Sequence, residues 1–433
     1  MAFPAGKCLA PDYEELNHLT EAPMIKVSKR KDQTRLRRIA LAAQGLLQSQ
    51  PFGRGLSDTH KAIQHIGYVQ IDTISVVERA HHHVLRSRVP NYQPDMLTQL
   101  LEKRDVFEYW SHAAAFLPIA DFRFSLPYKQ AIQNGQVHWY KNRDDKLMAE
   151  ILDRIRSDGP LRSRDLESPP KQQTGWWDWK PTKQAIEQLY MQGELMVTNR
   201  ESFQKVYDLT ERVLPSHIDT STPSTEELAA HLIDQQLRCH GLVSLRGITY
   251  LRRNAPLRQA VKSIITERID QGSLEQLVLD NDETFFITAS ALEQPLPRLT
   301  KRLQILSPFD NSVIQRERLK SLFQFDYQIE CYVPEAKRQY VYFSLPLIYG
   351  DQFIGRMDCK AHRNTRHFEI KSLHFEQHDF DDDEIISAFA EAMIKFCQFQ
   401  QCDSVSLINV YPKNLMLPMQ NALNKLQLNE AGK

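Results

Sequence analysis

"KPTKQAIEQLYMQGELMVTNRESFQKVYDLT", residues 180–210, passes from an amphipathic segment directly into two short β-like runs. The apolar side chains of its first half recur at the spacing of one helix face: Ala185, Ile186, Leu189 and Tyr190. Gly193 stands where such a helix would end, because glycine accepts the left-handed backbone of a helix terminus. The second half predicts a hairpin with a polar, basic tip at Asn199 and Arg200. A helix followed by a small hairpin is the second half of a winged helix.

The same succession occurs twice more in the chain. HKAIQHIG, from residue 60, runs into YVQIDTI, and SIITERIDQG, from residue 263, runs into SLEQLVLD. STEE at 224–227 is a capping box and predicts a helix start ahead of the last copy. We therefore expect an N-terminal extension and three winged-helix units in tandem, at residues 1–30, 31–145, 146–218 and 219–300.

The pattern changes after residue 300. YQIECYVP, QYVYFSLPLIYG and DQFIGRMDCKAHR alternate apolar and polar residues, as strands do. EIISAFAEAMIKFCQF follows them as an amphipathic helix. We expect residues 301–433 to form a β-barrel-like domain with covering helices. The whole chain is then an α+β fold, with tandem winged-helix (helix-turn-helix) domains followed by a C-terminal β-barrel-like domain.

Composition narrows the class of protein. The 433 residues fit about two to four domains. The six cysteines include no Cys-x-x-Cys pair, which argues against a zinc ribbon or a disulfide framework. No apolar run is long enough to span a membrane, and the first residues lack the pattern of a signal peptide. The sequence indicates a cytoplasmic protein without a membrane segment, and we expect a monomer.

The run VQIDT places two polar side chains, Gln70 and Asp72, on either side of Ile71. In a strand they would project from the same face while Ile71 points into a core. A carboxylate beside an amide can hold and activate a water: the aspartate accepts a proton or stabilises positive charge, and the glutamine orients the water. A short Gln-x-Asp is more often a plain polar face, so the motif alone is weak.

Three histidines and two arginines follow in ERAHHHVLRSR. Three consecutive histidine side chains do not easily converge on one metal ion, and no HExxH spacing accompanies them. On a helix these residues would form a cationic ridge suited to phosphate. GxxxxGK[ST], GxGxxG and GxSxG signatures are absent from the sequence, so neither a nucleotide cofactor nor a metal is expected. A metal-dependent nuclease built on the histidines remains a rival hypothesis.

Long segments resemble one family in the same order along about residues 33–400: GYVQIDTISVVERAHHHVLRSR, GWWDWKPTKQAIEQLYMQGELMV, YDLTERVLP and the stretch from LSPFDN to KAHR. The chain resembles the AlkZ-like DNA glycosylases, bacterial enzymes with tandem winged helices and a β-barrel. Their catalytic motif is Gln-hydrophobic-Gln or Gln-hydrophobic-Asp, and Gln70 and Asp72 match the second form. The resemblance implies metal-free hydrolysis of the N-glycosidic bond of N7-alkylguanine, and unhooking of interstrand crosslinks, in double-stranded DNA.

Other residues are candidates for weaker roles. The basic residues after the motif and in the second winged helix are candidate DNA-backbone contacts: His82, His83, Arg86, Arg88, Lys180, Lys183, Arg200 and Lys205. Asp310 and Asn311 either support the site or cap the helix that follows. The alternative function is a non-catalytic winged-helix regulator, which binds DNA sequence-specifically and is indifferent to Asp72→Ala.

Overall fold

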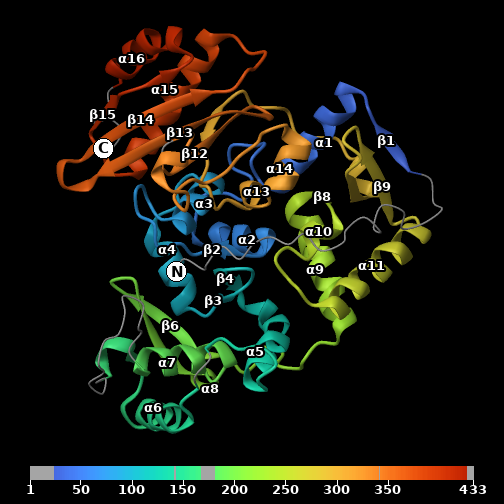
Figure 1. The fold of residues 1–433 in the computed structure, drawn as a ribbon, viewed down its shortest axis with the longest axis vertical. Coiled ribbons are helices and arrows are strands. Elements are labelled where there is room, and N and C mark those ends of the chain that lie inside the picture. The colour runs from blue at the N-terminus through green and yellow to red at the C-terminus, as the bar shows by residue number, and fades with distance from the viewer. Residues whose placement is uncertain (1–23, 141–142, 167–180, 341, 427–433) are drawn as a thin grey trace. The chain divides into compact units, whose positions relative to one another are not determined.

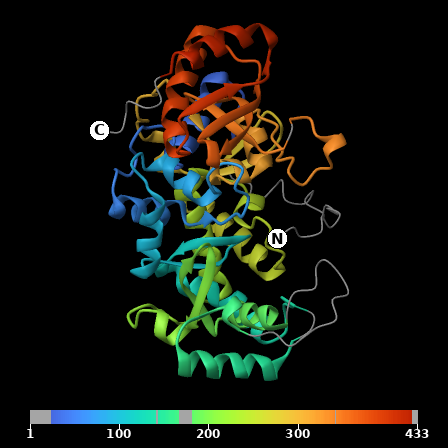
Figure 2. The same cartoon turned by 90° about the vertical axis from the view of Figure 1, so that its left-hand side faces the viewer.

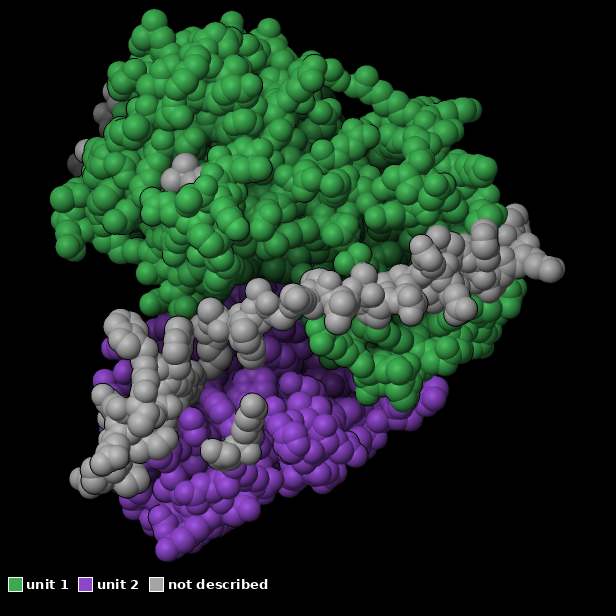
Figure 3. All heavy atoms as spheres, viewed as in Figure 1, with its two compact units in different colours: residues 1–53, 72–90, 229–433 green, residues 54–71, 91–228 purple. Residues whose placement is uncertain are grey.

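The computed structural model describes residues 24–140, 143–166, 181–340 and 342–426. The chain divides into two compact units, coloured in Figure 3. Unit 1 comprises residues 1–53, 72–90 and 229–433, and unit 2 comprises residues 54–71 and 91–228. Helices long and apolar enough to cross a membrane are absent from these described ranges.

The first part of unit 2 is a three-stranded sheet with helices. Its elements are α2 (Leu56–Ile66), β2 (Val69–Gln70), α4 (Pro94–Glu102), β3 (Val106–Trp110), β4 (Ala114–Pro118) and α5 (Leu126–Gln133). The strand order is β2-β4-β3, and both pairings are antiparallel. Helix α2 ends at Gly67, whose φ of 78° is left-handed, as the helix-to-strand succession in the sequence predicts.

The second part of unit 2 follows the quoted stretch. Its elements are α6 (Asp145–Asp158), β5 (Leu161–Arg162), α7 (Pro181–Gln192), β6 (Leu195–Glu201), β7 (Gln204–Leu209) and α8 (Thr210–Val213). Gly193 ends α7 with a φ of 92°, which confirms its predicted place. The hairpin turns at Ser202 and Phe203, whose φ values are positive. Asn199 and Arg200 therefore lie within β6, and their predicted place at the hairpin tip was wrong.

Unit 1 contains a four-stranded sheet of order β1-β9-β10-β8. The sheet and its helices are β1 (Ile25–Val27), α1 (Arg30–Ala43), α9 (Thr225–His240), β8 (Leu242–Val243), α10 (Leu245–Ile248), α11 (Ala255–Asp270), β9 (Leu274–Leu279), β10 (Thr284–Thr288) and α12 (Ala289–Glu293). The predicted capping box is present at the start of α9: the Glu227 amide donates to Ser224 Oγ, and the Ser224 amide donates to the Glu227 carboxylate. Strand β1 belongs to the segment predicted as an N-terminal extension, and it pairs in parallel with β9.

The remaining part of unit 1 is a six-stranded sheet with helices, formed by the C-terminal residues and by α3 from earlier in the chain. Its elements are α3 (Ala80–Arg88), β11 (Leu303–Ile305), α13 (Asn311–Ile314), α14 (Arg316–Phe323), β12 (Ser344–Tyr349), β13 (Gln352–His362), β14 (His367–Phe375), α15 (Asp382–Phe399), β15 (Ser404–Leu407), β16 (Val410–Tyr411) and α16 (Met416–Asn424). The order is β11-β12-β13-β14-β15, with β16 also paired to β14. In Figures 1 and 2 the red helices of this segment lie against its orange and red strands.

This sheet is a half-barrel, and α15 packs its apolar face on it through residues such as Phe389 and Met393, which are fully buried. The predicted mixture of helices and strands, with a C-terminal curled sheet and a covering helix, is confirmed. The assignment of the three earlier segments as winged helices stays a prediction, as do the domain boundaries that rest on it.

Candidate functional site

Gln70 is the last residue of β2 and belongs to unit 2. Strand β2 forms because Tyr68, Val69 and Ile71 are apolar and buried, and Gln70 pairs with Ala115 of β4. The Gln70 side chain is only 7% exposed. Its Oε1 accepts a hydrogen bond from His112 Nε2 at 3.1 Å. The histidine thus fixes the orientation of the amide, as a group that positions a water requires.

Asp72 begins the next segment of unit 1 and lies outside the strand. Its Oδ1 accepts a hydrogen bond from the backbone N–H of Ile74 at 2.7 Å, and Ile74 in turn packs against the C-terminal core. The loop therefore holds one carboxylate oxygen in place. Within the described residues no other hydrogen bond to Asp72 is formed.

Burial raises the pKa of Asp72 above its ordinary value, and the hydrogen bond from Ile74 only partly opposes this. Two neighbours in unit 1 respond to the charge of this carboxylate. Burial and then Asp72 raise the pKa of the Cys331 thiol to about 11 and that of the Tyr332 phenol to about 12. The Tyr332 side chain is 58% exposed, so an aromatic surface lies open to solvent beside the carboxylate.

The strand-face explanation for the motif was incomplete. Strand β2 ends at Gln70, so the alternation of strand side chains does not orient Asp72. The Asx-type hydrogen bond to Ile74 does so instead.

Helix α3 carries the basic residues that follow the motif, and two of the four do not face solvent. Arg88 is fully buried in an ion pair with Asp310. His83 is 2% exposed, and its Nε2 donates to the backbone oxygen of Ile305 at 2.8 Å. Neither side chain can reach a DNA backbone, because buried groups with protein partners have no contact with solvent. The predicted DNA contacts of Arg88 and His83 are therefore corrected to structural roles.

The other two basic residues of α3 are partly exposed. Burial, and then the charge of Arg79, lower the pKa of His82 to about 4, so His82 is neutral at pH 7. Arg86 lies on the wall of a pocket.

In the described ranges no three histidine, cysteine or carboxylate residues are grouped closely enough to hold a metal ion.

The basic residues predicted on the second winged helix also differ in their surroundings. Lys180 lies outside the described residues, and Lys183 is exposed near the start of α7. Arg200 donates two hydrogen bonds of 2.8 Å to the carboxylate of Glu108, which is fully buried. Lys205 joins the same carboxylate at 3.1 Å. Arg200 and Lys205 thus neutralise a buried acid while both stay partly exposed, so their predicted DNA contacts stay predictions.

Asp310 has the capping role that the sequence offered as one of two alternatives. It is the N-cap of α13 and accepts from the Ser312 amide at 2.9 Å. Asn311 is buried at the start of the same helix.

Sequence reasoning missed His112 and Tyr332. His112 stands in the turn between β3 and β4, and only the pairing of β4 with β2 brings it to Gln70.

Comparison with known proteins identifies a family and a fold. A family model described as "DNA glycosylase AlkZ-like" matches residues 63–399. Among solved structures, the DNA glycosylase AlkZ of Streptomyces sahachiroi matches with a TM-score of 0.55 and 11% sequence identity. The match covers 89% of this chain and 100% of that one. At this identity the structural likeness concerns the fold.

Proposed function

The chain belongs to the AlkZ-like DNA glycosylase family, and from this premise we propose that it releases N7-alkylated guanine from double-stranded DNA and unhooks interstrand crosslinks. The family assignment covers DNA repair and hydrolysis of an N-glycosidic bond. The lesion is our proposal, and so are the roles of Gln70 and Asp72. The observation that carries it is the Asp72 carboxylate, which is partly buried and held through one oxygen.

The chemistry of the substrate explains why such a site suffices. Alkylation at N7 makes the guanine cationic, so the base leaves without protonation by a general acid. The sugar then develops positive charge, which a nearby carboxylate stabilises. Asp72 is proposed to supply this negative charge and to accept a proton from the attacking water. Gln70, with its amide oriented by His112, is proposed to position that water.

A good leaving group also removes the need for a tight pocket around a fully flipped base. A crosslinked guanine, which remains attached to the opposite strand, can then be processed by the same two side chains. Attack by water leaves an abasic site and an intact strand. Since the motif has no lysine beside it in the sequence, we propose a monofunctional glycosylase.

The test is base release from a duplex with one N7-methylguanine in the presence of EDTA. We expect release by the wild type and a loss of about 10²–10⁴-fold in Asp72→Asn. Asp358→Asn is a matched control: burial raises the pKa of this carboxyl too, and it accepts a backbone N–H, from Phe343, but it lies in β13. It should retain base release.

Three outcomes would contradict the proposal. No release by the wild type, on either this duplex or a crosslinked one, returns the protein to the regulator class. Equal release by wild type and Asp72→Asn removes the carboxylate from the chemistry. Strand scission that EDTA abolishes supports the metal-dependent nuclease.

A further inference from the structure

A pocket of about 270 Å³ lies within unit 1, and the glycosylase proposal makes no use of it. Four segments form its walls: residues 49–50, α3 with Arg86, the residues around β11 with Arg302 just before the strand, and the end of α15 with Lys395. Phe396 and Phe399 supply apolar wall. The described residues that line it include no aspartate and no glutamate. The pocket therefore concentrates positive charge in a concave, partly apolar site.

The guanidinium of Arg86 is partly buried and has no carboxylate partner among the described residues. It lies over the Phe399 ring, 5.8 Å from its centre. Across the described part of the chain, no group accepts a hydrogen bond from it and no carboxylate pairs with it. Burial lowers the pKa of Arg86, as expected for a cation that is desolvated without compensation.

Arg302 has protein partners for only part of its guanidinium. Its Nη2 donates to the backbone oxygens of Leu46 and Gln48, but its buried Nε has no acceptor among the described residues. Burial lowers the pKa of Arg302 to about 10, so the side chain still carries its charge at pH 7. Two partly buried guanidinium groups on the wall of one pocket without a carboxylate are costly, because a desolvated charge needs a counter-charge. An anion bound between them would remove that cost.

We propose that this pocket binds a phosphate group. Arginine forks match the oxygens of a phosphate, and exposed Lys395 adds a third cation at the rim. The volume is below that of most drug-sized ligand sites, which fits one phosphate with part of an attached group. The first source is a phosphodiester of the DNA backbone, and in that form the inference rests on the proposed function. The second source is a small phosphorylated compound.

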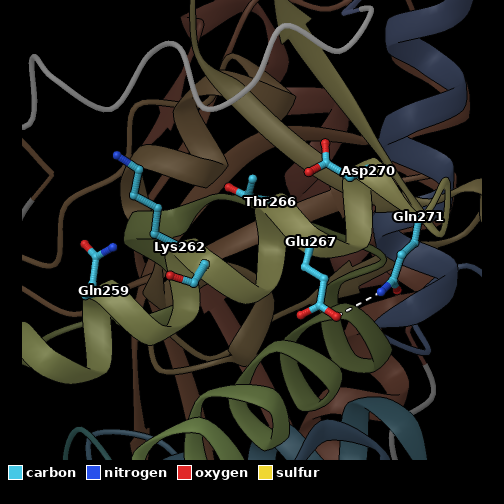
Figure 4. A pocket seen from close by; sticks show the side chains of 7 residues that line it. Gln259, Lys262, Thr266, Glu267, Asp270 and Gln271 are labelled. Carbon is cyan, nitrogen blue, oxygen red and sulfur yellow. Dashed lines mark hydrogen bonds between the residues drawn. The ribbon is translucent and has the colours of Figure 1, made fainter.

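A second pocket of the same unit shows what distinguishes this one. It has about 590 Å³ and lies along α11, where Figure 4 shows its side chains on consecutive turns of one helix. Lys262 is there accompanied by Glu267 and Asp270, and Glu267 accepts a hydrogen bond from Gln271. The carboxylates offset the positive charge of Lys262, and all the lining side chains come from the region of one helix, so the α11 pocket has no preference for an anion. The α11 pocket is larger but carries no comparable inference.

The first experiment needs no DNA. The Tm of the full chain is measured with increasing inorganic phosphate, and with chloride at equal ionic strength. We expect phosphate alone to raise the Tm of the wild type by about 2–4 °C. Arg86→Gln should lose this rise and, because it removes an uncompensated cation, should be at least as stable as wild type without phosphate. Lys395→Gln should reduce the rise, whereas Lys360→Gln, an exposed lysine of β13 away from the pocket, should keep it.

The second experiment separates the two sources. Binding of an undamaged duplex is measured over a range of salt concentrations. The slope of log K against log salt is negative, and each lost phosphate contact makes it shallower by about 0.9. A shallower slope in Lys395→Gln, together with a smaller effect of phosphate on Tm, identifies a DNA phosphate. An unchanged slope with the same reduced effect identifies a small phosphorylated ligand. Equal effects of phosphate and chloride on the wild type, or a full phosphate effect in Arg86→Gln, overturn the proposal. If the wild type releases no base but the Tm results hold, only the proposed function fails.

Discussion

The ion pair between Arg88 and Asp310 is fully buried in unit 1, and its removal should be costly. Arg88 Nη1 and Nη2 donate to the two Asp310 oxygens at 2.7 and 3.0 Å. Its other N–H groups reach Val84 and Gln44. Asp310→Asn keeps the shape but leaves Arg88 as an uncompensated cation. We predict that it lowers the free energy of unfolding of unit 1 by about 3–5 kcal/mol.

The reverse change, Arg88→Met, leaves the carboxylate without its partner. Burial by itself would raise the pKa of Asp310, but Arg88 and the hydrogen bonds from Ser312 hold that pKa below its ordinary value. The stabilisation is therefore fully present above the unfolded pKa of about 3.9 and is lost as pH falls through the lower folded pKa. The stability difference between wild type and Arg88→Met should shrink as pH falls, because the unpaired Asp310 of the variant is protonated at a higher pH than in the wild type and then loses its burial penalty.

The assay is chemical denaturation followed by far-UV circular dichroism for wild type, both single variants and Arg88→Met/Asp310→Asn. The double variant has no unpaired charge, so its loss should be smaller than the sum of the single losses by about 2 kcal/mol or more. Additive losses, or single losses below about 1 kcal/mol, would refute the reasoning. The salt slope of DNA binding gives an independent check: it should be unchanged in Arg88→Met, because Arg88 does not face solvent.

Three further predictions concern other buried charges. Asp72→Asn should raise the Tm at pH 7 by about 2 °C although it lowers the rate of base release, because burial raises the folded pKa of Asp72 and penalises the ionised form at every pH above that value. Thermal melts at several pH values check this, and a lower Tm contradicts it. For the same reason base release by the wild type should increase with pH through a midpoint above 3.8, and a midpoint at or below that value in a pH–rate profile contradicts the raised pKa. Lys129 in unit 2 has its Nζ 3.8 Å from the centre of the Phe122 ring, and burial lowers its pKa to about 7; the charged form is penalised fully below pH 7 and not at all above about 10.5, so Lys129→Met should stabilise unit 2 by roughly 1–3 kcal/mol at pH 6 and much less at pH 10. Chemical denaturation at the two pH values measures the Lys129 effect, and a pH-independent gain would show that packing rather than charge is responsible.

Local structure was predictable because its causes are local. The helix-to-strand successions at Gly67 and Gly193 were confirmed, since glycine at a left-handed helix end depends only on neighbouring residues. The capping box at Ser224 and Glu227 was confirmed for the same reason. The tip of the β6–β7 hairpin was misplaced because Ser202 and Phe203 carry no strong turn signal and nevertheless adopt positive φ.

The candidate site was predictable only in part. Gln70 and Asp72 stand two residues apart, so sequence alone brings them together. His112 is 42 positions from Gln70, and its contact follows from the pairing of β2 with β4. Tyr332 approaches Asp72 through the packing of Ile74 and Cys331 on one core. Neither residue has a signal in the sequence that separates it from other histidines and tyrosines.

The sequence by itself determined the mixture of helices and strands, their order and the family to which the chain belongs. The tertiary structure alone decided which cations remain available to an anion. Arg88 and Asp310 are 222 positions apart, and Arg200 is 92 positions from Glu108, yet each arginine is neutralised by its distant acid. Arg86, two residues before Arg88, has no such acid in the part of the chain that the structure describes. The physical reason is that a charge is compensated by whatever the folded chain places within a few ångströms of it, and that neighbour is set by packing.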